Sequence, residues 1–186
     1  YFQRCDGTAA TVEDFLACFE EASGQDLTAF ARWYAQAGTP SLTVTGRYDA
    51  SARTYRLDFV QKTAPTPGQP DKDPLVIPIA VGLVDPQTGP VAARAEGLRE
   101  DGVYVLDQAS GGLTFTGVER PPIPSVLRGF SAPVRVSLDL SDEEMLALVR
   151  RDADPFNRFQ SAQVVGARLV IRLSRAEAPD EAAAMP

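Results

Sequence analysis

The stretch Phe30–Thr45 constrains the fold most, because the spacing of its apolar residues changes there from helical to extended. Before Gly38, apolar residues recur every three or four positions, which is the spacing of one helical face. After Pro40 they alternate with polar residues, as in a half-buried strand. Gly38 suits the left-handed residue that ends a helix, and Pro40 blocks its continuation. We therefore expect helices before this stretch and strands after it.

Residues 1–37 are predicted to form helices. Thr11 and Asp14 make a T-x-x-D capping pattern in front of an apolar stripe, which indicates the start of one helix. Asp26 is placed to cap a second helix, which we expect to continue to about Ala37.

The middle of the chain predicts about seven short strands, separated by turn residues. We expect the first two to pair as an antiparallel hairpin with both apolar rows facing inward. The segment Ala64–Pro74 contains four prolines and a glycine, so it is predicted to be a loop. Pro78 is expected to place its strand at an edge or a bulge, and Pro121–Pro124 to interrupt the series. The expected strands cover residues 41–48, 55–60, 75–83, a short piece near Val91, 102–106, 113–116 and 134–140.

This strand pattern has no βαβ spacing and no internal repeat, so it predicts a mainly β fold. An antiparallel β-sandwich with flanking helices at both ends fits best, and a small closed barrel is the alternative.

Helical signals return at Ser141, where Ser141 and Glu144 form a capping box. Asp154-Pro155 then supplies the cap and first-turn proline of a further helix. That helix carries an apolar stripe which we do not expect the sandwich alone to cover, and residues 176–186 are expected to be a frayed end. The stripe consists of Phe159, Ala162, Gly166, Leu169 and Leu173.

The charge distribution argues against two kinds of partner. The chain has 18 Lys and Arg against 25 Asp and Glu, a net charge of −7, and its basic residues are scattered rather than clustered. A nucleic-acid-binding surface needs clustered positive charge, so no nucleic acid partner is expected. No apolar run reaches the roughly 18 residues of a membrane span. We expect a soluble, cytoplasmic protein with no membrane partner.

The chain contains no histidine. A Ser-His-Asp or Cys-His relay and a paired-histidine zinc site are therefore impossible within it. Any catalysis would have to use carboxylates, lysine or tyrosine. The two cysteines, Cys5 and Cys18, are too few for a disulfide scaffold and are interpreted as ordinary thiols.

Acidic residues offer three possible sites, and each has a simpler explanation. Glu20 and Glu21 are adjacent in a helix and point apart, as residues of a solvated face do. The acidic run from Asp142 to Glu144 lies in a helix first turn, where negative charge is favoured. Asp71 and Asp73 could bind a cation only weakly, because no further ligands lie near them.

Aromatic and glycine pairs add no site. Trp33-Tyr34 could form a stacking platform, but both residues adjoin the expected core face and are predicted to pack there. Gly111-Gly112 lacks the following helix of a phosphate-binding loop and is predicted to be a plain turn. We assign no catalytic, cofactor-binding or metal-binding residue to this sequence.

Four collinear segments resemble the M1 family of zinc metallo-aminopeptidases, in its bacterial alanyl aminopeptidase branch. The most specific part is the W-Y-x-Q-x-G-T-P run from Trp33 to Pro40. The segments are RCDGTAATVEDF (4–15), DLTAFARWYAQAGTP (26–40), PLVIPIAVGL (74–83) and FSAPV (130–134). The family has four domains, and the chain is similar to the third, an immunoglobulin-like β-sandwich, together with its flanks.

The resemblance implies three parts: residues 1–38 as the last helices of the catalytic, thermolysin-like domain, 39–140 as the β-sandwich, and 141–186 as the first helices and tail of the C-terminal helical domain. It also implies zinc and peptide substrates for the parent enzyme. None of the family's catalytic motifs occurs in this sequence, so no cofactor is expected here.

The function implied by the resemblance is that of a non-catalytic, rigid spacer within an aminopeptidase. Its partners would be the catalytic and helical domains of the same parent chain. The alternative is a free-standing β-sandwich that binds a sugar or a protein ligand, for which exposed aromatic residues on one face would be the sign. A carboxylate-based hydrolase ranks last, because it needs two acids that converge in a pocket.

Overall fold

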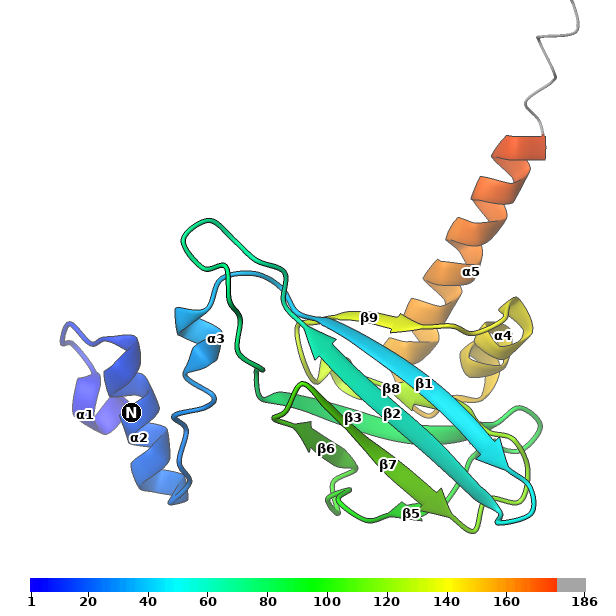
Figure 1. Ribbon diagram of the computed structural model, residues 1–186, viewed down its shortest axis with the longest axis horizontal. Helices are drawn as coiled ribbons and strands as arrows, with labels where there is room; N and C mark the ends of the chain where they lie inside the picture. Colours follow the sequence, from blue (N-terminus) through cyan, green and yellow to red (C-terminus); the bar gives the residue numbers. More distant parts are fainter. Residues whose placement is uncertain (177–186) are drawn as a thin grey trace, which may run out of the picture.

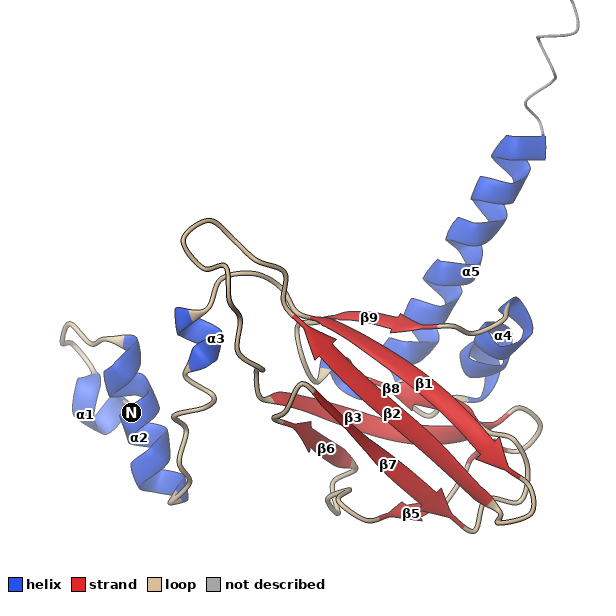
Figure 2. Ribbon diagram, viewed as in Figure 1, coloured by secondary structure: helices blue, strands red, loops and turns tan. Residues whose placement is uncertain are grey.

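The computed structural model describes residues 1–176. Two β-sheets form its centre, and helices flank them on both sides in the sequence (Figure 1). Figure 2 shows that α1 and α2 stand apart from the sheets, whereas α4 and the first half of α5 lie against them. The helices are α1 (Phe2–Cys5), α2 (Val12–Ser23), α3 (Arg32–Ala35), α4 (Asp142–Arg151) and α5 (Pro155–Ala176).

The larger sheet has five strands in the order β5-β7-β2-β1-β9. The predicted hairpin is confirmed, because β1 and β2 pair antiparallel from Ser41↔Lys62 to Asp49↔Thr54. The sandwich is antiparallel as predicted except at β9, which pairs parallel to β1. The strands are β1 (Ser41–Asp49), β2 (Thr54–Lys62), β5 (Arg94–Ala95), β7 (Ser110–Thr116) and β9 (Arg135–Leu138).

The smaller sheet is built around β3 (Ile77–Asp85). Its other strands are β4 (Gly89–Pro90), β6 (Val103–Leu106) and β8 (Ile123–Val126). β3 is therefore a central strand of this sheet. Pro78 lies in its first half, where β3 pairs with β6 alone, because β8 pairs only with Val81 to Val84. The expected interruption at Pro121–Pro124 is wrong, since β8 starts at Ile123 and pairs with β3.

The core lies between the two sheets and follows the predicted alternation. Leu42 and Val44 on β1 are buried, and β2 and β3 contribute further alternate residues. This burial supplies most of the folding free energy, at about 25 cal/mol per Å² of apolar surface. The fully buried aliphatic and aromatic residues include Leu57, Phe59, Ile77, Ile79, Leu106 and Leu113.

Two glycines of β7 correct a prediction. Gly111 and Gly112 belong to the strand rather than to a turn. A side chain at Gly111 would collide with the Tyr104 hydroxyl, and one at Gly112 would lie 2.7 Å from the Leu57 carbonyl oxygen. They are glycines because neighbouring groups approach the strand closely.

The N-terminal helices match the prediction only in part. The capping box of α2 is confirmed: the Thr11 hydroxyl accepts from the Asp14 amide, and the Asp14 carboxylate accepts from the Thr11 amide. The second predicted helix is wrong in length, because α3 is a single turn from Arg32 to Ala35 and its C-cap, Gln36, is extended. The side-chain amide of Gln69, in the proline-rich loop, accepts from the Ala37 backbone amide and donates to the Ala35 carbonyl oxygen, so it bonds backbone groups at the end of this short helix. An isolated short helix has little stability of its own.

The C-terminal helices begin where predicted. Ser141 and Glu144 form the capping box of α4, and α5 starts at Pro155. The apolar stripe of α5 remains uncovered: Phe159, Leu169 and Leu173 are 58%, 49% and 52% exposed. The predicted frayed end, beyond Ala176, lies outside the described residues.

Candidate functional site

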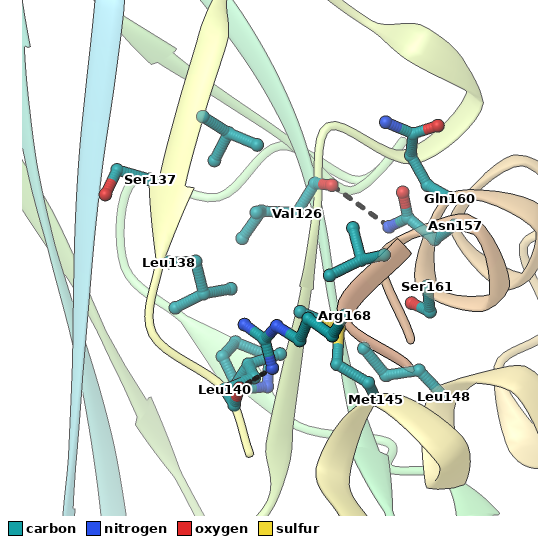
Figure 3. A pocket seen from close by; sticks show the side chains of 13 residues that line it. Val126, Ser137, Leu138, Leu140, Met145, Leu148, Asn157, Gln160, Ser161 and Arg168 are labelled. Carbon is teal, nitrogen blue, oxygen red and sulfur yellow. Dashed lines mark hydrogen bonds between the residues drawn. The ribbon is translucent and has the colours of Figure 1, made fainter. Parts of the chain in front are cut away.

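The junction between the sandwich and the C-terminal helices combines a pocket with several side-chain hydrogen bonds and ion pairs. A pocket of about 350 Å³ lies there, between β8 and β9 on one side and α4 and α5 on the other (Figure 3). Its wall is largely apolar, with Leu138, Leu140 and Met145 among the lining residues. The polar lining comes mostly from α5, and β9 adds Ser137; the α5 residues are Asn157, Gln160, Ser161 and Arg168. This lining has no pair of acids that could act as catalytic acid and base.

Asn157 fastens α5 to the sandwich. Its side-chain amide donates to Ser125 Oγ at 2.8 Å and to the Val126 carbonyl oxygen at 3.0 Å, both on β8. Asp154 supports this geometry as the N-cap of α5, because its carboxylate accepts a hydrogen bond of 2.8 Å from the backbone amide of Asn157. The buried polar face of α5 therefore points at the sheet, and its apolar face points away.

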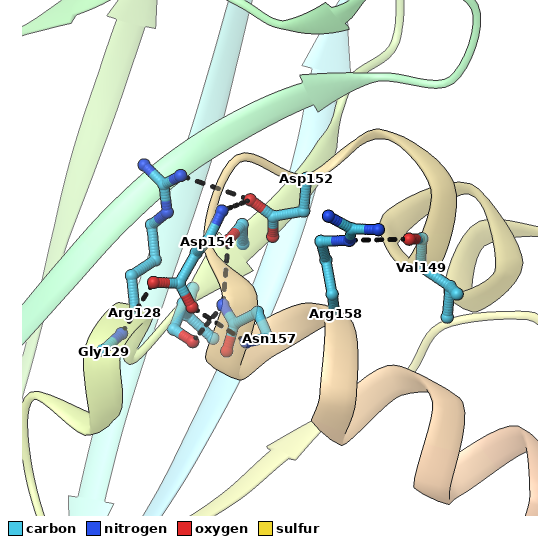
Figure 4. A network of polar contacts seen from close by, with 9 residues as sticks. Arg128, Gly129, Val149, Asp152, Asp154, Asn157 and Arg158 are labelled. Atoms are coloured by element: carbon cyan, nitrogen blue, oxygen red, sulfur yellow. Dashed lines mark hydrogen bonds and ion pairs between the residues drawn. The ribbon is translucent and has the colours of Figure 1, made fainter.

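An ion pair with one fully buried partner lies beside this contact (Figure 4). Arg128 follows β8 in the short 3-10 turn η1 (Arg128–Phe130), and its guanidinium lies 3.2 Å from the carboxylate of Asp152, whose side chain has no exposed surface. The same Asp152 oxygen accepts from the Asp154 amide at 2.9 Å, and Asp154 accepts from the Gly129 amide at 3.0 Å. This network joins the turn after β8 to the connection between α4 and α5.

The two C-terminal helices are also held to each other. Arg168 of α5 donates to the Leu140 carbonyl oxygen at 3.0 Å and to the Asp142 carboxylate at 2.9 Å. Arg172 adds a second contact to Asp142, at 2.8 Å. Hydrogen bonds from these arginines lower the pKa of Asp142. Glu144 takes the capping role predicted for this acidic turn, whereas the ion pairs of Asp142 with α5 were not predicted.

The N-terminal junction rests on α3 and the proline-rich loop. The indole nitrogen of Trp33 donates to the Val76 carbonyl oxygen at 2.7 Å, and Arg32 donates to the Pro74 carbonyl oxygen at 3.0 Å. Gln36 exchanges two hydrogen bonds with the backbone of Asp73. α3 is therefore fixed to the edge of the sandwich by directional contacts.

The two aromatic residues predicted to pack in the core, Trp33 and Tyr34, lie in different environments. Trp33 packs against the core cluster, as predicted. Tyr34 is 53% exposed, so the prediction is wrong for this residue, which instead meets the ring of Phe30. The one-turn helix cannot turn two adjacent side chains to the same side.

The remaining acidic candidates are separated or paired. The carboxylate of Glu20 accepts from the Leu27 amide, whereas Glu21 pairs with Arg4. Asp73 lies 3.9 Å from Arg32, a cation that competes with any metal ion. Within residues 1–176, no three His, Cys, Asp or Glu side chains gather as metal ligands, so the described residues do not fit a zinc centre.

Sequence reasoning missed the contacts of Asn157 and Arg128. Their partners lie 32 and 24 positions away in the chain. The only local signal is Asp154-Pro155, which marks the start of α5 but not the sheet it packs on.

The two sheets and the flanking helices define the chain as an immunoglobulin-like β-sandwich domain with helical extensions. The family model described as "Domain of unknown function (DUF3458) Ig-like fold" matches residues 38–139. The chain belongs to this family. No helix in the described part of the chain is long and apolar enough to span a membrane.

Three similar proteins are aminopeptidases. Aminopeptidase N of Caulobacter vibrioides is 49% identical over 181 residues, which are 97% of this chain and 20% of the relative. Aminopeptidase N of Escherichia coli is 39% identical over 163 residues, covering 88% and 19%. The crystal structure of Legionella pneumophila aminopeptidase A in complex with aspartic acid matches with a TM-score of 0.78 and 29% identity, covering 95% and 19%.

These matches confirm the resemblance to bacterial aminopeptidase N that the sequence segments indicated. The chain spans about 20% of the length of the curated relatives it matches.

Proposed function

We propose that this chain is a non-catalytic spacer within a larger aminopeptidase, in which it holds a helical part on each side at a fixed position. The observation that carries the proposal is the orientation of α5. Its polar side chains Asn157 and Ser161 are buried against the sandwich, whereas Leu169, Val170 and Leu173 are exposed. A free-standing domain would be expected to place these faces the other way round.

α5 provides the strongest support. Asn157 and Ser161 on its inner face are buried, while Val170 on its outer side is 65% exposed. Leu169 and Leu173 extend this outer face over one further turn, and each is about half exposed. A helix with this arrangement is suited to pack against further helices.

The proposed domain boundaries follow from the same features. Residues 1–38 would be the last helices of the catalytic domain, 39–140 the sandwich, and 141–186 the start of the C-terminal helical domain. The family match supports the central part, and the capping box at Ser141 supports the start of the last one.

The activity belongs to the proposed parent protein. The relatives are named aminopeptidases, so we propose that the whole protein removes N-terminal amino acids from peptides in the cytoplasm. Zinc held elsewhere in that protein would activate the attacking water. The described residues of this chain would contribute position rather than chemistry, because they offer no metal ligand set.

The free-standing binding module receives less support. It requires exposed aromatic residues on one face of the sandwich. The exposed aromatic residues of the described chain lie instead on the helices, in η1 or at the N-terminus, namely Tyr1, Phe2, Phe19, Tyr34, Phe130 and Phe159.

The test is a binding experiment between this chain and separately purified preceding and following parts of the parent protein. Each part is expected to form a complex with the chain in size-exclusion chromatography. Leu169→Lys should weaken the complex with the following part at least about tenfold, since it places a charge in an apolar contact. Gln163→Lys, at an exposed polar position of the same helix, is the matched control. The spacer proposal is wrong if neither part binds.

A further inference from the structure

The first two helices, α1 and α2, lie side by side, and two side-chain contacts join them. The rings of Tyr1 and Phe15 meet edge to face, with centroids 5.2 Å apart. Further along, the guanidinium of Arg4 lies 3.3 Å from the carboxylate of Glu21. These two contacts fix which faces of α1 and α2 meet.

The two cysteines of the chain each lie about one helical turn beyond the contact of Tyr1 and Phe15. Cys5 follows Tyr1 by four positions, and Cys18 follows Phe15 by three, so each cysteine shares a helix face with one ring of that contact. Cys5 is buried and Cys18 is partly exposed, and both thiols are free. Burial raises the pKa of the Cys5 thiol, and the neighbouring Cys18 thiol raises it further. Because the contacts run from Tyr1 and Phe15 to Arg4 and Glu21, the two helices point the same way, and one turn beyond the first contact brings Cys5 and Cys18 next to each other.

We propose that Cys5 and Cys18 form a redox site, which a small disulfide such as oxidised glutathione converts into an internal disulfide between α1 and α2. This inference does not depend on the proposed spacer function. It concerns the fastening of α1, a single helical turn, to its neighbour.

The reaction proceeds by two exchanges. The thiolate of Cys18, the more accessible sulfur, attacks oxidised glutathione, forms a mixed disulfide and releases one glutathione thiolate. Cys5 then loses its proton to solvent and attacks Cys18 Sγ, which releases the second glutathione thiolate. The two cysteines give up two electrons and two protons, and one oxidised glutathione becomes two reduced glutathiones.

The test uses the whole chain, oxidised with glutathione disulfide, alkylated with iodoacetamide and digested with a protease that cleaves after glutamate. Glu13 separates the two cysteines, so an internal disulfide joins peptide 1–13 to the peptide that begins at Asp14. We expect this linked peptide, a mass loss of two hydrogens and no alkylated cysteine. Glutathione adducts or intermolecular dimers without the linked peptide would overturn the proposal.

Two comparisons show whether the fold itself brings the two cysteines together or whether they react as independent exposed thiols. Cys5→Ser should keep glutathione on Cys18, because no second thiol displaces it. In the intact sequence, conversion of the mixed disulfide to the internal one should be at least about tenfold faster in the folded chain than in concentrated urea, since folding raises the local concentration of one thiol near the other. Equal rates in both states would show that the fold does not bring the cysteines together.

Discussion

The side-chain amide of Asn157 on α5 donates a hydrogen bond of 2.8 Å to Oγ of Ser125 on β8, and both residues are buried. Asn157→Leu removes this bond and the one to Val126, which leaves two buried acceptors without a donor. We expect a loss of about 2 kcal/mol in the free energy of unfolding, as is usual for unsatisfied buried groups. Urea denaturation followed by circular dichroism measures it.

The matched control is Gln160→Leu, which changes an exposed amide one turn further along α5. Its effect should stay within about 0.5 kcal/mol. Equal losses for both variants would mean that Asn157 contributes through general helix packing rather than through its hydrogen bonds.

Replacing only one partner of the ion pair between Arg128 and Asp152 should lower the free energy of unfolding strongly. Arg128→Met leaves a fully buried carboxylate without its cation, which is expected to cost about 3–5 kcal/mol. Adding Asp152→Asn should restore part of the loss, so the double variant is more stable than the sum of the two single changes predicts. The free energies of unfolding of all four proteins form the thermodynamic cycle.

An exposed pair gives the comparison. Arg53 and Glu119 lie 2.9 Å apart with more than half of each side chain exposed. Arg53→Gln should cost less than about 1 kcal/mol, because solvent screens the pair. If Arg53→Gln destabilised the protein as much as Arg128→Met, burial of the carboxylate would not explain the larger effect expected for Arg128.

Gly46 and Gly166 should respond to alanine in opposite directions. A methyl group at Gly46 on β1 would overlap the Tyr55 hydroxyl, whereas Gly166 on α5 has open space around it. Gly46→Ala is expected to cost about 2 kcal/mol through overpacking, and Gly166→Ala to gain about 0.5–1 kcal/mol through helix propensity. Thermal unfolding of each variant shows whether its melting temperature falls or rises. If Gly46→Ala proved harmless, the Tyr55 ring would have to move aside at little cost, and a Tyr55→Phe background would show whether the hydroxyl is the obstacle.

Asp85 should make stability depend on pH. Hydrogen bonds from the Thr88 and Gln87 amides, with help from Arg120, lower the pKa of its carboxyl group. The charged form therefore stabilises the fold above the unfolded pKa of about 3.9, and this contribution is lost as pH falls through the lower folded value.

The matching experiment compares unfolding free energies of the natural chain and Asp85→Asn between pH 7 and pH 2. The natural chain should be more stable at neutral pH, and the difference should shrink below about pH 4. Asp107→Asn, at an exposed position, serves as the control. A difference that stays constant with pH would exclude the carboxylate as its cause.

Local patterns predicted much of this fold. The alternation in β1 and β2 and the capping boxes at Thr11 and Ser141 each depend on residues a few positions apart, so the sequence reveals them directly. The sequence segments also pointed to the right family.

The errors concern features that depend on distant partners. Ile123 and Pro124 form a strand because β3 offers them a ladder, which no local signal reveals. At the end of the short α3, backbone groups of Ala35 and Ala37 bond to the side chain of Gln69 in the proline-rich loop, more than 30 positions away, and no local signal reveals this partner. The contacts of Asn157 and Arg128 were missed for the same reason.

The parallel pairing of β1 with β9 has a mechanical consequence. The chain enters the sandwich at Ser41, the start of β1, and leaves it after Leu138, the end of β9, and the two strands pair in register from Ser41↔Arg135 to Val44↔Leu138. Tension between the two flanks would pull these parallel strands from opposite ends. The load would then act in shear on the whole ladder at once, rather than opening it one hydrogen bond at a time.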